Sequence, residues 1–292
     1  AESSIRDQAA EFSIRDQAGR RVSVPADPKR VVALAPSITE VVFALGRGDR
    51  LVGVTQFSDY PKAAESIDSV GSYVYLDLEK IVSLNPDLCL AIKDGNPRAI
   101  VSRLGEIGIP VYAVNPRGLD SVMETIADIG KLLNAGKKAN TLLGRMQSQL
   151  AAIDKRVATV SRRPRVFFQI GVNPIVSAGA DTFIHELIVR AGGKNMAGDV
   201  SGYPRFSREE IIAQAPDIII VTSMARKKTF EEVVAKWRQW SDIPAVKNER
   251  IYLVDSDVFD RPSPRLIEAL EKLVRLIHPE LFGEEGTKGL RD

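Results

Sequence analysis

The stretch "LEKIVSLNPDLCLAI", residues 78–92, recurs in altered form as "REEIIAQAPDIIIVT" at residues 208–222. In each copy a glutamate, Glu79 or Glu209, stands seven residues before a Pro-Asp pair. The residues before the pair have the apolar spacing of a short amphipathic helix, and those after it form a continuous apolar strand. Because the residue before a proline avoids the helical conformation, the pair predicts where each helix ends and each strand begins.

A second pair of segments has nearly the same spacing. "RVVALAPSITEVVFALG" begins at Arg30, and "RVFFQIGVNPIVSAGADTFIHELIVRAGG" begins at Arg165, 135 residues later, while the first pair is 130 residues apart. Both members are typical of a buried strand followed by a turn and a helix. A repeat of this length, seen twice, predicts two α/β lobes of similar build.

The turn after the first of these strands differs from a nucleotide-binding turn. It has no glycine at the point where a phosphate would approach the backbone. We expect Pro36 and Ser37 to shape a rigid lip beside a ligand, with Ser37 or Thr39 capping the helix. The matching lip of the second lobe is "IGVNP", residues 170–174.

Apolar runs suited to parallel strands covered on both faces recur along the chain. They are "VVALA", "DLCLAI", "VYAV", "RVFFQI", "DIIIVT" and "IYLV", with helix-patterned segments between them. This order predicts βαβ units and two Rossmann-like lobes with parallel sheets. Cys89, the single cysteine, is expected to be a buried residue of one strand.

The connection between the lobes is predicted to be helical. Residues 119–160 have helical periodicity and contain no proline. We expect Gly136 to interrupt them, which leaves one long rigid helix over residues 137–160 as the link. Such a link predicts a ligand cleft between the lobes, because ligands favour domain interfaces and the carboxyl ends of parallel strands.

These segments predict the organisation of the whole chain. Residues 1–29 form a polar leader and a short hairpin, with Gly19 in the turn. The N-terminal lobe occupies residues 30–136, the linking helix 137–160 and the C-terminal lobe 161–282, and a tail covers 283–292.

Composition excludes some classes of protein. The chain has 40 lysines and arginines against 38 aspartates and glutamates, for a formal net charge of +2. A dedicated nucleic-acid binder usually gathers a basic excess in one region, so no nucleic-acid partner is expected. No apolar run approaches the roughly 20 residues that cross a bilayer. A signal peptide is absent from this chain, and we expect one to have been cleaved from the precursor.

The sequence offers little for catalysis. It contains two histidines: His185 on a predicted helix and His278 near a helix end, where a cation suits the helix dipole. No nucleophile elbow, His-Glu-x-x-His motif or cysteine-histidine cluster is present. We therefore predict a protein that is not an enzyme. The alternatives are a chelatase or reductase with a catalytic group in the cleft, and an adhesion protein using "RGD", residues 47–49.

Aromatic residues gather in predicted loops at strand ends, which suits a large, flat and partly apolar ligand held by stacking. They are Phe57, Tyr60, Tyr73, Tyr75, Tyr203 and Phe259. The last loop, "SDVFDRPSPR", also carries Asp257, Asp260, Arg261 and Arg265. These charges either form a structural salt bridge or hydrogen-bond polar groups at the edge of a ligand.

The repeated glutamates Glu79 and Glu209 have two interpretations. A carboxylate at a helix start often serves only as a capping group. Since each lobe carries one in an equivalent place, the pair could instead dock into basic pockets on a partner with two-fold symmetry.

Taken in order, the motifs "LAPSITEVVFALG", "VGVTQFSDYP", "DLEKIVSLNPDL", "RVFFQIGVNP", "SREEIIAQAPDIIIVT" and "SDVFDRPSPR" resemble those of a known family. The chain is similar to the periplasmic substrate-binding proteins of ABC importers for metal chelates, whose lobes are joined by one long helix. Within that group it looks most like the vitamin B12 (cobalamin)-binding proteins. The likeness runs from about residue 30 to residue 278.

The resemblance implies cobalamin or a related corrinoid as transported ligand, with no cofactor, and a monomer in the periplasm. It implies that Glu79 and Glu209 meet arginines on the two permease subunits, in the inner membrane, of a transporter driven by a separate ATPase. It also implies a set of ligand-facing residues, which are Pro36, Ser37, Phe57, Tyr73, Ile92, Ile170, Tyr203, Asp257 and Arg261.

Four positions depart from the cobalamin-binding pattern. Where that family tends to place tryptophan or phenylalanine, this chain has Tyr73, Ile92, Ile170 and Tyr203. The ligand could therefore be an incomplete corrinoid. The resemblance also leaves haem open, with Tyr73 or Tyr75 as an axial ligand to the iron. A ferric siderophore would favour a more basic cleft.

Overall fold

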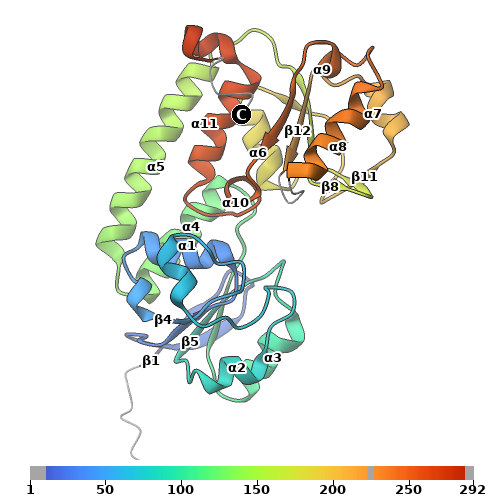
Figure 1. Ribbon diagram of the computed structural model, residues 1–292. Coiled ribbons are helices and arrows are strands. Elements are labelled where there is room, and N and C mark those ends of the chain that lie inside the picture. Colours follow the sequence, from blue (N-terminus) through green and yellow to red (C-terminus); the bar gives the residue numbers. More distant parts are fainter. Residues whose placement is uncertain (1–10, 223–226, 287–292) are drawn as a thin grey trace, which may run out of the picture. The chain divides into compact units, whose positions relative to one another are not determined.

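The computed structural model describes residues 11–222 and 227–286, and the chain divides into two compact units. Unit 1 comprises Ala1–Pro116 and Asp120–Arg145, and unit 2 comprises Arg117–Leu119 and Met146–Asp292. The predicted leader over residues 1–10 and residues 287–292 of the predicted tail lie outside the described residues. The predicted α/β class, with a parallel sheet in each of two lobes, is confirmed (Figure 1).

Unit 1 starts with a hairpin and continues as an alternation of strands and helices. Its elements are β1 (Glu11–Arg15), β2 (Arg21–Pro25), β3 (Val31–Ala33), α1 (Pro36–Ala44), η1 (Gly48–Arg50), β4 (Leu51–Gly53), η2 (Lys62–Ser66), α2 (Leu78–Ser83), β5 (Leu88–Ile92), α3 (Arg98–Glu106), β6 (Val111–Val114), α4 (Leu119–Leu132) and the first part of α5 (Gly136–Val157). Four strands form one parallel sheet in the order β4-β3-β5-β6.

Successive side chains of a strand point to opposite faces of the sheet, and the strands of this sheet are apolar on both. Helices cover both faces. One face packs on α2 and α3 through a core of Val32, Leu34, Cys89, Ala91, Val111, Ala113, Ile81 and Leu104. The other face contacts α1, and the Tyr112 hydroxyl donates a hydrogen bond to Asp128 of α4. Cys89 is fully buried as predicted, and burial raises the pKa of its thiol to about 12.

The predicted hairpin is present and is tied to the edge of the sheet. β1 and β2 pair antiparallel, and Gly19 in the turn has a positive φ of 86°. The Gln17 amide donates to the Ala113 carbonyl of β6, and the Gln17 side-chain oxygen accepts from the Asn115 amide. The tip of the hairpin therefore lies beside the carboxyl end of β6.

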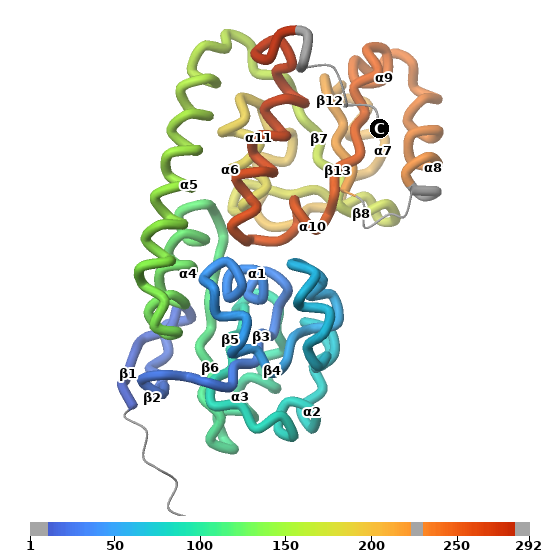
Figure 2. The backbone as a smooth tube through the Cα atoms, turned by 60° about the vertical axis from the view of Figure 1, so that its left-hand side comes forward, coloured from blue at the N-terminus to red at the C-terminus, as the bar shows by residue number. Residues whose placement is uncertain are grey.

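Unit 2 repeats the same architecture. Its elements are the second part of α5, β7 (Arg165–Gln169), β8 (Gly171–Val172), β9 (Ile175–Val176), α6 (Phe183–Arg190), β10 (Lys194–Asn195), β11 (Arg205–Phe206), α7 (Arg208–Gln214), β12 (Ile218–Thr222), α8 (Lys227–Arg238), α9 (Pro244–Lys247), β13 (Ile251–Val254), α10 (Ser256–Phe259), α11 (Leu266–Ile277) and η3 (Pro279–Gly286). The parallel sheet has the order β10-β7-β12-β13, and β11, β9 and β8 form a small antiparallel sheet. Within unit 2, α11 runs beside the end of α5 (Figure 2).

The internal repeat is confirmed at the level of single residues. Asn85 and Ala215, which are 130 residues apart, both have a positive φ, of 51° and 45° respectively. Each follows the helix of its repeat and precedes the proline of the Pro-Asp pair. A left-handed residue followed by proline ends a helix sharply. In both units the backbone therefore turns into the central strand in the same way.

The aspartate of each pair fixes the strand beside it. The Asp87 carboxylate accepts hydrogen bonds from the backbone amides of Lys29 and Arg30, at 2.7 and 3.0 Å. In unit 2 the Asp217 carboxylate accepts from the Arg165 amide at 2.7 Å and pairs with the Arg162 guanidinium at 2.8 Å. Each aspartate thus sets the register between the first strand of its unit, β3 or β7, and the central strand.

An arginine at the start of the first strand of each unit, Arg30 or Arg165, completes this arrangement. The Arg30 guanidinium donates to the Leu84 carbonyl at 2.6 Å, and the Arg165 guanidinium donates to the Gln214 carbonyl at 2.8 Å. Both carbonyls lie at the carboxyl end of the helix that comes before the central strand, which is α2 or α7. The helix itself supplies no hydrogen-bond donor to these carbonyls. In each unit, one cluster of hydrogen bonds therefore joins the end of the helix, the turn at the proline and the starts of two strands.

The helical segment 119–160 is broken, as expected, but not at Gly136. α4 ends at Leu132, and Asn134 has a positive φ of 51°. The Asn134 side chain donates to the Ala26 carbonyl and to Asp27, which holds the turn. Gly136 is instead the first residue of α5, a continuous helix of 22 residues that passes from unit 1 to unit 2.

We predict that Asp217→Ala lowers the free energy of unfolding by about 1–3 kcal/mol, because the Arg165 amide and the Arg162 guanidinium lose their acceptor. Urea unfolding followed by circular dichroism measures the change. Asp242→Ala is the matched control, since Asp242 is exposed and forms no hydrogen bond or ion pair within the described residues. Equal effects of the two substitutions would contradict the role given to Asp217.

Candidate functional site

The carboxyl ends of the parallel strands carry the loops that the sequence marked as ligand-facing. In unit 1, Pro36 is the first residue of α1 and Ser37 the second, and the N-cap is Ala35 in an extended conformation. The prediction that Ser37 or Thr39 caps this helix is wrong, because no side chain caps it. Pro36 lacks an amide hydrogen, so one of the groups that a cap would satisfy is absent.

Thr39 holds a neighbouring loop instead of capping the helix. Its hydroxyl lies 3.1 Å from that of Ser58, which lies 2.9 Å from that of Thr55. All three side chains are buried. Phe57, between Thr55 and Ser58, is 52% exposed, so the buried hydroxyls anchor a loop whose aromatic ring faces outward. Neither Ser58 nor Thr55 was identified from the sequence.

Asn96 joins three segments of the unit 1 face. Its side-chain oxygen accepts from the Ile92 amide at 2.7 Å, and its amide donates to the carbonyls of Leu34 and Tyr73 at 2.7 and 2.8 Å. Asn96 is buried, and every one of these bonds replaces one lost to water. The predicted ligand residues Tyr73 and Ile92 are thereby brought together. The only sequence signal for Asn96 is the Asn-Pro pair, which marks a turn.

The loop that carries the two candidate haem tyrosines is short and closed. Gly71 and Leu76 form an isolated antiparallel bridge across it. Gly71 has a φ of 92°, and a Cβ there would lie 2.4 Å from the Tyr75 carbonyl oxygen, so only glycine fits. Tyr73 is 41% exposed and Tyr75 83% exposed. The loop therefore presents both rings to solvent on a fixed backbone.

In unit 2 the corresponding face is built on the small antiparallel sheet. Ile170 follows β7, and its amide donates to the Val176 carbonyl of β9. Gln169 donates from its side chain to the Gly171 carbonyl and accepts from the Trp237 indole nitrogen at 3.1 Å. Tyr203, which precedes β11, is 56% exposed. Gln169 and Trp237 position this sheet, and neither was identified from the sequence.

The "SDVFDRPSPR" segment forms a structural ion pair. The Arg261 guanidinium lies 2.5 Å from the Asp257 carboxylate, and the Arg265 guanidinium donates to the Asp257 carbonyl at 2.9 Å. The expectation that Phe259 lies in an open loop is wrong. Phe259 ends the one-turn helix α10, is fully buried, and packs with its ring centroid 6.2 Å from that of Phe168.

Asp260 is the most perturbed acid of this face. Both of its carboxylate oxygens are buried, and within the described residues neither has a hydrogen-bond partner, nor does the nearby Thr222 hydroxyl. Burial raises the pKa of Asp260 to about 7, and the carboxylates of Asp257 and Asp255 add to the increase. The Arg261 guanidinium opposes it.

Glu79 and Glu209 occupy equivalent positions, and the interpretation of both as caps is wrong. Each is the second residue of its helix, α2 or α7, and each is exposed. The α2 cap is Asp77, whose side chain accepts from the Lys80 amide, and the α7 cap is a capping box of Ser207 and Glu210. Within the described part of the chain, neither Glu79 nor Glu209 forms an ion pair or hydrogen bond.

The two histidines have structural positions. His185 lies on α6, and its Nδ1 is 3.1 Å from the side-chain nitrogen of Asn195 in β10. His278 is 2% exposed at the end of α11, with Nε2 3.1 Å from the Gly192 carbonyl and Nδ1 2.7 Å from Glu280. Among residues 11–222 and 227–286, no three His, Cys, Asp or Glu side chains are grouped to hold a metal ion, and no helix is long and apolar enough to span a membrane.

The chain thus consists of two α/β units with the same strand order and with exposed aromatic side chains in loops at the strand ends. A family described as "Periplasmic binding protein" matches residues 31–258. The chain therefore belongs to the periplasmic binding protein family, whose members are transport components of ABC importers rather than enzymes, and work with membrane permease and ATPase components.

Curated relatives cover most of the chain. It is 36% identical to an uncharacterised ABC transporter substrate-binding lipoprotein of Bacillus subtilis, over 93% of this chain and 87% of the relative. It is 30% identical to a vitamin B12-binding protein of Vibrio parahaemolyticus, over 83% of this chain and 86% of the relative.

Solved structures share the fold but differ in the ligand that their descriptions name. The periplasmic haem-binding protein RhuT of Roseiflexus is 27% identical with a TM-score of 0.78, covering 87% of this chain and 99% of that one. The vitamin B12-binding protein BtuF of Vibrio cholerae is 28% identical with a TM-score of 0.75, over 87% and 98%. A possible iron-binding protein of Staphylococcus epidermidis is 32% identical with a TM-score of 0.76, over 86% and 99%.

We predict that Asp260→Asn stabilises the protein in a pH-dependent way. An aspartate in an unfolded chain has a pKa of about 3.9, so the raised value means that the folded state binds an extra proton between about pH 4 and pH 7. Stability due to this group is therefore lost as the pH rises through that window. The substitution should raise the free energy of unfolding at pH 8, by up to about 4 kcal/mol, and leave it nearly unchanged at pH 4.

Urea unfolding at pH 4, 6 and 8 measures this difference. Asp242→Asn, at an exposed position, is the control and should show no such pH dependence. A stabilisation by Asp260→Asn that is the same at all three pH values would contradict a pKa of Asp260 that is raised by burial.

Proposed function

We propose that the chain is the periplasmic receptor of an ABC importer and that it captures cobalamin or a related corrinoid. The observation that carries this proposal is the set of outward-facing aromatic rings at the strand ends. Phe57, Tyr73 and Tyr203 are each 41–56% exposed, although an exposed aromatic ring loses the free energy that its burial would supply. A broad, partly apolar ligand would cover these rings, and the vitamin B12-binding relatives support a corrinoid as that ligand.

The backbone beneath these rings is already fixed. Buried hydrogen bonds through Ser58, Asn96 and Gln169 hold the three loops in place, so little ordering is needed when a ligand binds. The remaining proposed contacts are Pro36, Ser37, Ile92, Ile170, Asp257 and Arg261. Asp257 and Arg261 would offer a polar edge for the amide groups of a corrinoid.

Haem is the second candidate, and one observation favours it. Tyr75 is 83% exposed on a closed loop, and its hydroxyl forms no hydrogen bond within the described residues. A tyrosine phenolate is an established axial ligand for haem iron. The haem-binding protein RhuT is about as similar to this chain as BtuF, which supports keeping this candidate. A ferric siderophore is a third ligand that the iron-binding relative supports.

The proposed partner is a permease dimer of the inner membrane together with its ATPase, and we expect the receptor to act as a monomer. Glu79 and Glu209 are proposed to dock onto arginines of the two permease subunits. Both are exposed, have no ion pair among the described residues, and lie where the two repeats are equivalent. A carboxylate without a partner can form a strong charge-assisted pair with a guanidinium on another protein.

Titration of the purified chain with cobalamin, cobinamide and haemin, followed by absorption spectroscopy, tests the ligand. We expect saturable binding of a corrinoid. Phe57→Ala and Tyr73→Ala should each weaken it about tenfold, as for an aromatic side chain at the centre of a contact. The control is Phe12→Ala, because Phe12 is a similarly exposed ring on β1. A Soret band without corrinoid binding, lost in Tyr75→Phe, would assign the site to haem.

For the docking role, we predict that Glu79→Arg and Glu209→Arg each abolish most ligand uptake in cells and leave ligand affinity of the purified protein within about twofold. Reversal of the charge would place like charges against the permease, which costs several kcal/mol. Glu271→Arg, on the exposed side of α11, is the control and should leave uptake unchanged. Parallel loss of affinity and uptake would show that the glutamates act within the ligand site.

A further inference from the structure

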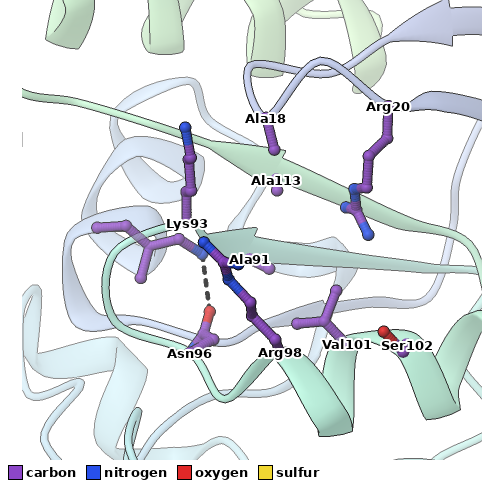
Figure 3. Close-up of a pocket in the computed structure, with 10 residues that line it drawn as sticks. Ala18, Arg20, Ala91, Lys93, Asn96, Arg98, Val101, Ser102 and Ala113 are labelled. Carbon is purple, nitrogen blue, oxygen red and sulfur yellow. Dashed lines mark hydrogen bonds between the residues drawn. The ribbon is translucent and has the colours of Figure 1, made fainter.

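Unit 1 contains a cavity that shares Ile92 and Asn96 with the proposed ligand face, while the proposed function assigns no role to its other lining residues. Its volume is about 300 Å³, and it lies between the tip of the β1–β2 hairpin, the carboxyl ends of β5 and β6, and the first turns of α3 (Figure 3). All ten residues that line it belong to this unit, and they are Ala18, Arg20, Ala91, Ile92, Lys93, Asn96, Arg98, Val101, Ser102 and Ala113.

The floor of the cavity is apolar. Ala91 and Ala113 are buried members of the core between the sheet and α3, and Ala18 and Val101 pack against that core. Three of these four side chains are alanines, so the core at this point is not covered by a large residue. The open space is therefore a consequence of small side chains on two adjacent strands and on the hairpin.

Cationic side chains reach the cavity from three elements. Arg20 belongs to the hairpin, Lys93 follows β5, and Arg98 is the first residue of α3 (Figure 3). None of the ten lining residues is acidic. The first turn of α3 adds to the positive potential, because its N-cap is Pro97 and no side chain caps the amides there.

Two of these three charges are uncompensated. The Arg20 guanidinium pairs with the Asp16 carboxylate at 2.7 Å and also donates to the Val111 carbonyl. The side chains of Lys93 and Arg98 form no ion pair or hydrogen bond within the described residues. Asp16 cannot serve them, since its fully buried carboxylate already accepts from the amides of Ala18 and Arg20 and from the Arg20 side chain.

We infer that this cavity is a binding site for a small organic anion, a carboxylate with a short apolar body. The carboxylate would pair with Arg98 and Lys93, and the apolar body would cover the alanine floor. A cavity of this volume lies at the lower end of the range for small-molecule sites. Inorganic phosphate would match the charge but leave the floor hydrated. The inference does not depend on which chelate the receptor carries.

Isothermal titration of the whole chain with sodium hexanoate, and separately with inorganic phosphate at equal ionic strength, tests this inference. We expect hexanoate to bind at one site per chain and more tightly than phosphate. Arg98→Ala should weaken hexanoate binding about tenfold, as for loss of one charge-assisted hydrogen bond. Ala18→Leu should weaken it at least as much, since the larger side chain occupies the floor.

Arg103→Ala is the matched control. Arg103 lies on the same helix, is exposed and pairs with Glu106 outside the cavity, so hexanoate affinity should stay within about twofold. No hexanoate binding, equal binding of phosphate and hexanoate, or equal loss in Arg98→Ala and Arg103→Ala would each overturn the inference. Circular dichroism confirms that each variant is folded.

Discussion

In each unit, a half-buried aspartate before the central strand accepts hydrogen bonds from the backbone at the start of the neighbouring strand, and the rest of the unit depends on this contact. Asp87 bonds the amides of Lys29 and Arg30, and Asp217 bonds the amide of Arg165. A charged acceptor makes these bonds stronger than ordinary backbone pairs. Because they fix the register of the first and central strands, they also determine where the carboxyl ends of those strands lie, and therefore which loops meet there.

At the opposite end of each sheet, buried polar side chains do the positioning. Asn96, Ser58 and Gln169 each satisfy backbone or side-chain groups that would be costly to bury alone. Their effect is to hold exposed aromatic rings on a fixed backbone. Asp260 and Thr222 are exceptions on this face, since their buried side-chain oxygens have no hydrogen-bond partner among the described residues. An unsatisfied acid next to the Asp257–Arg261 pair makes the stability of this part of unit 2 depend on pH.

Much of the fold could be predicted from local patterns, because they report local physics. The Pro-Asp pairs, the apolar strand runs and Gly19 each act within a few residues, and each predicted its element correctly. The errors arose where a local rule competed with another. Thr39 resembles a cap but bonds Ser58 instead, and Gly136 resembles a helix break although Asn134 supplies the left-handed residue. Phe259, in a stretch rich in polar residues, is buried because one helical turn directs it to the core.

The sequence by itself determined that the chain consists of two like α/β halves, and it identified the exposed aromatic and acidic residues of each. It did so because apolar periodicity, proline positions and internal repeats can be recognised from the order of residues alone. Only the tertiary structure decided which polar side chains hold those residues in place and that a basic cavity opens beside α3. Asn96 bonds Leu34 and Tyr73, which are 62 and 23 residues away. Such contacts form only when strands distant in sequence lie side by side, so no local pattern encodes them.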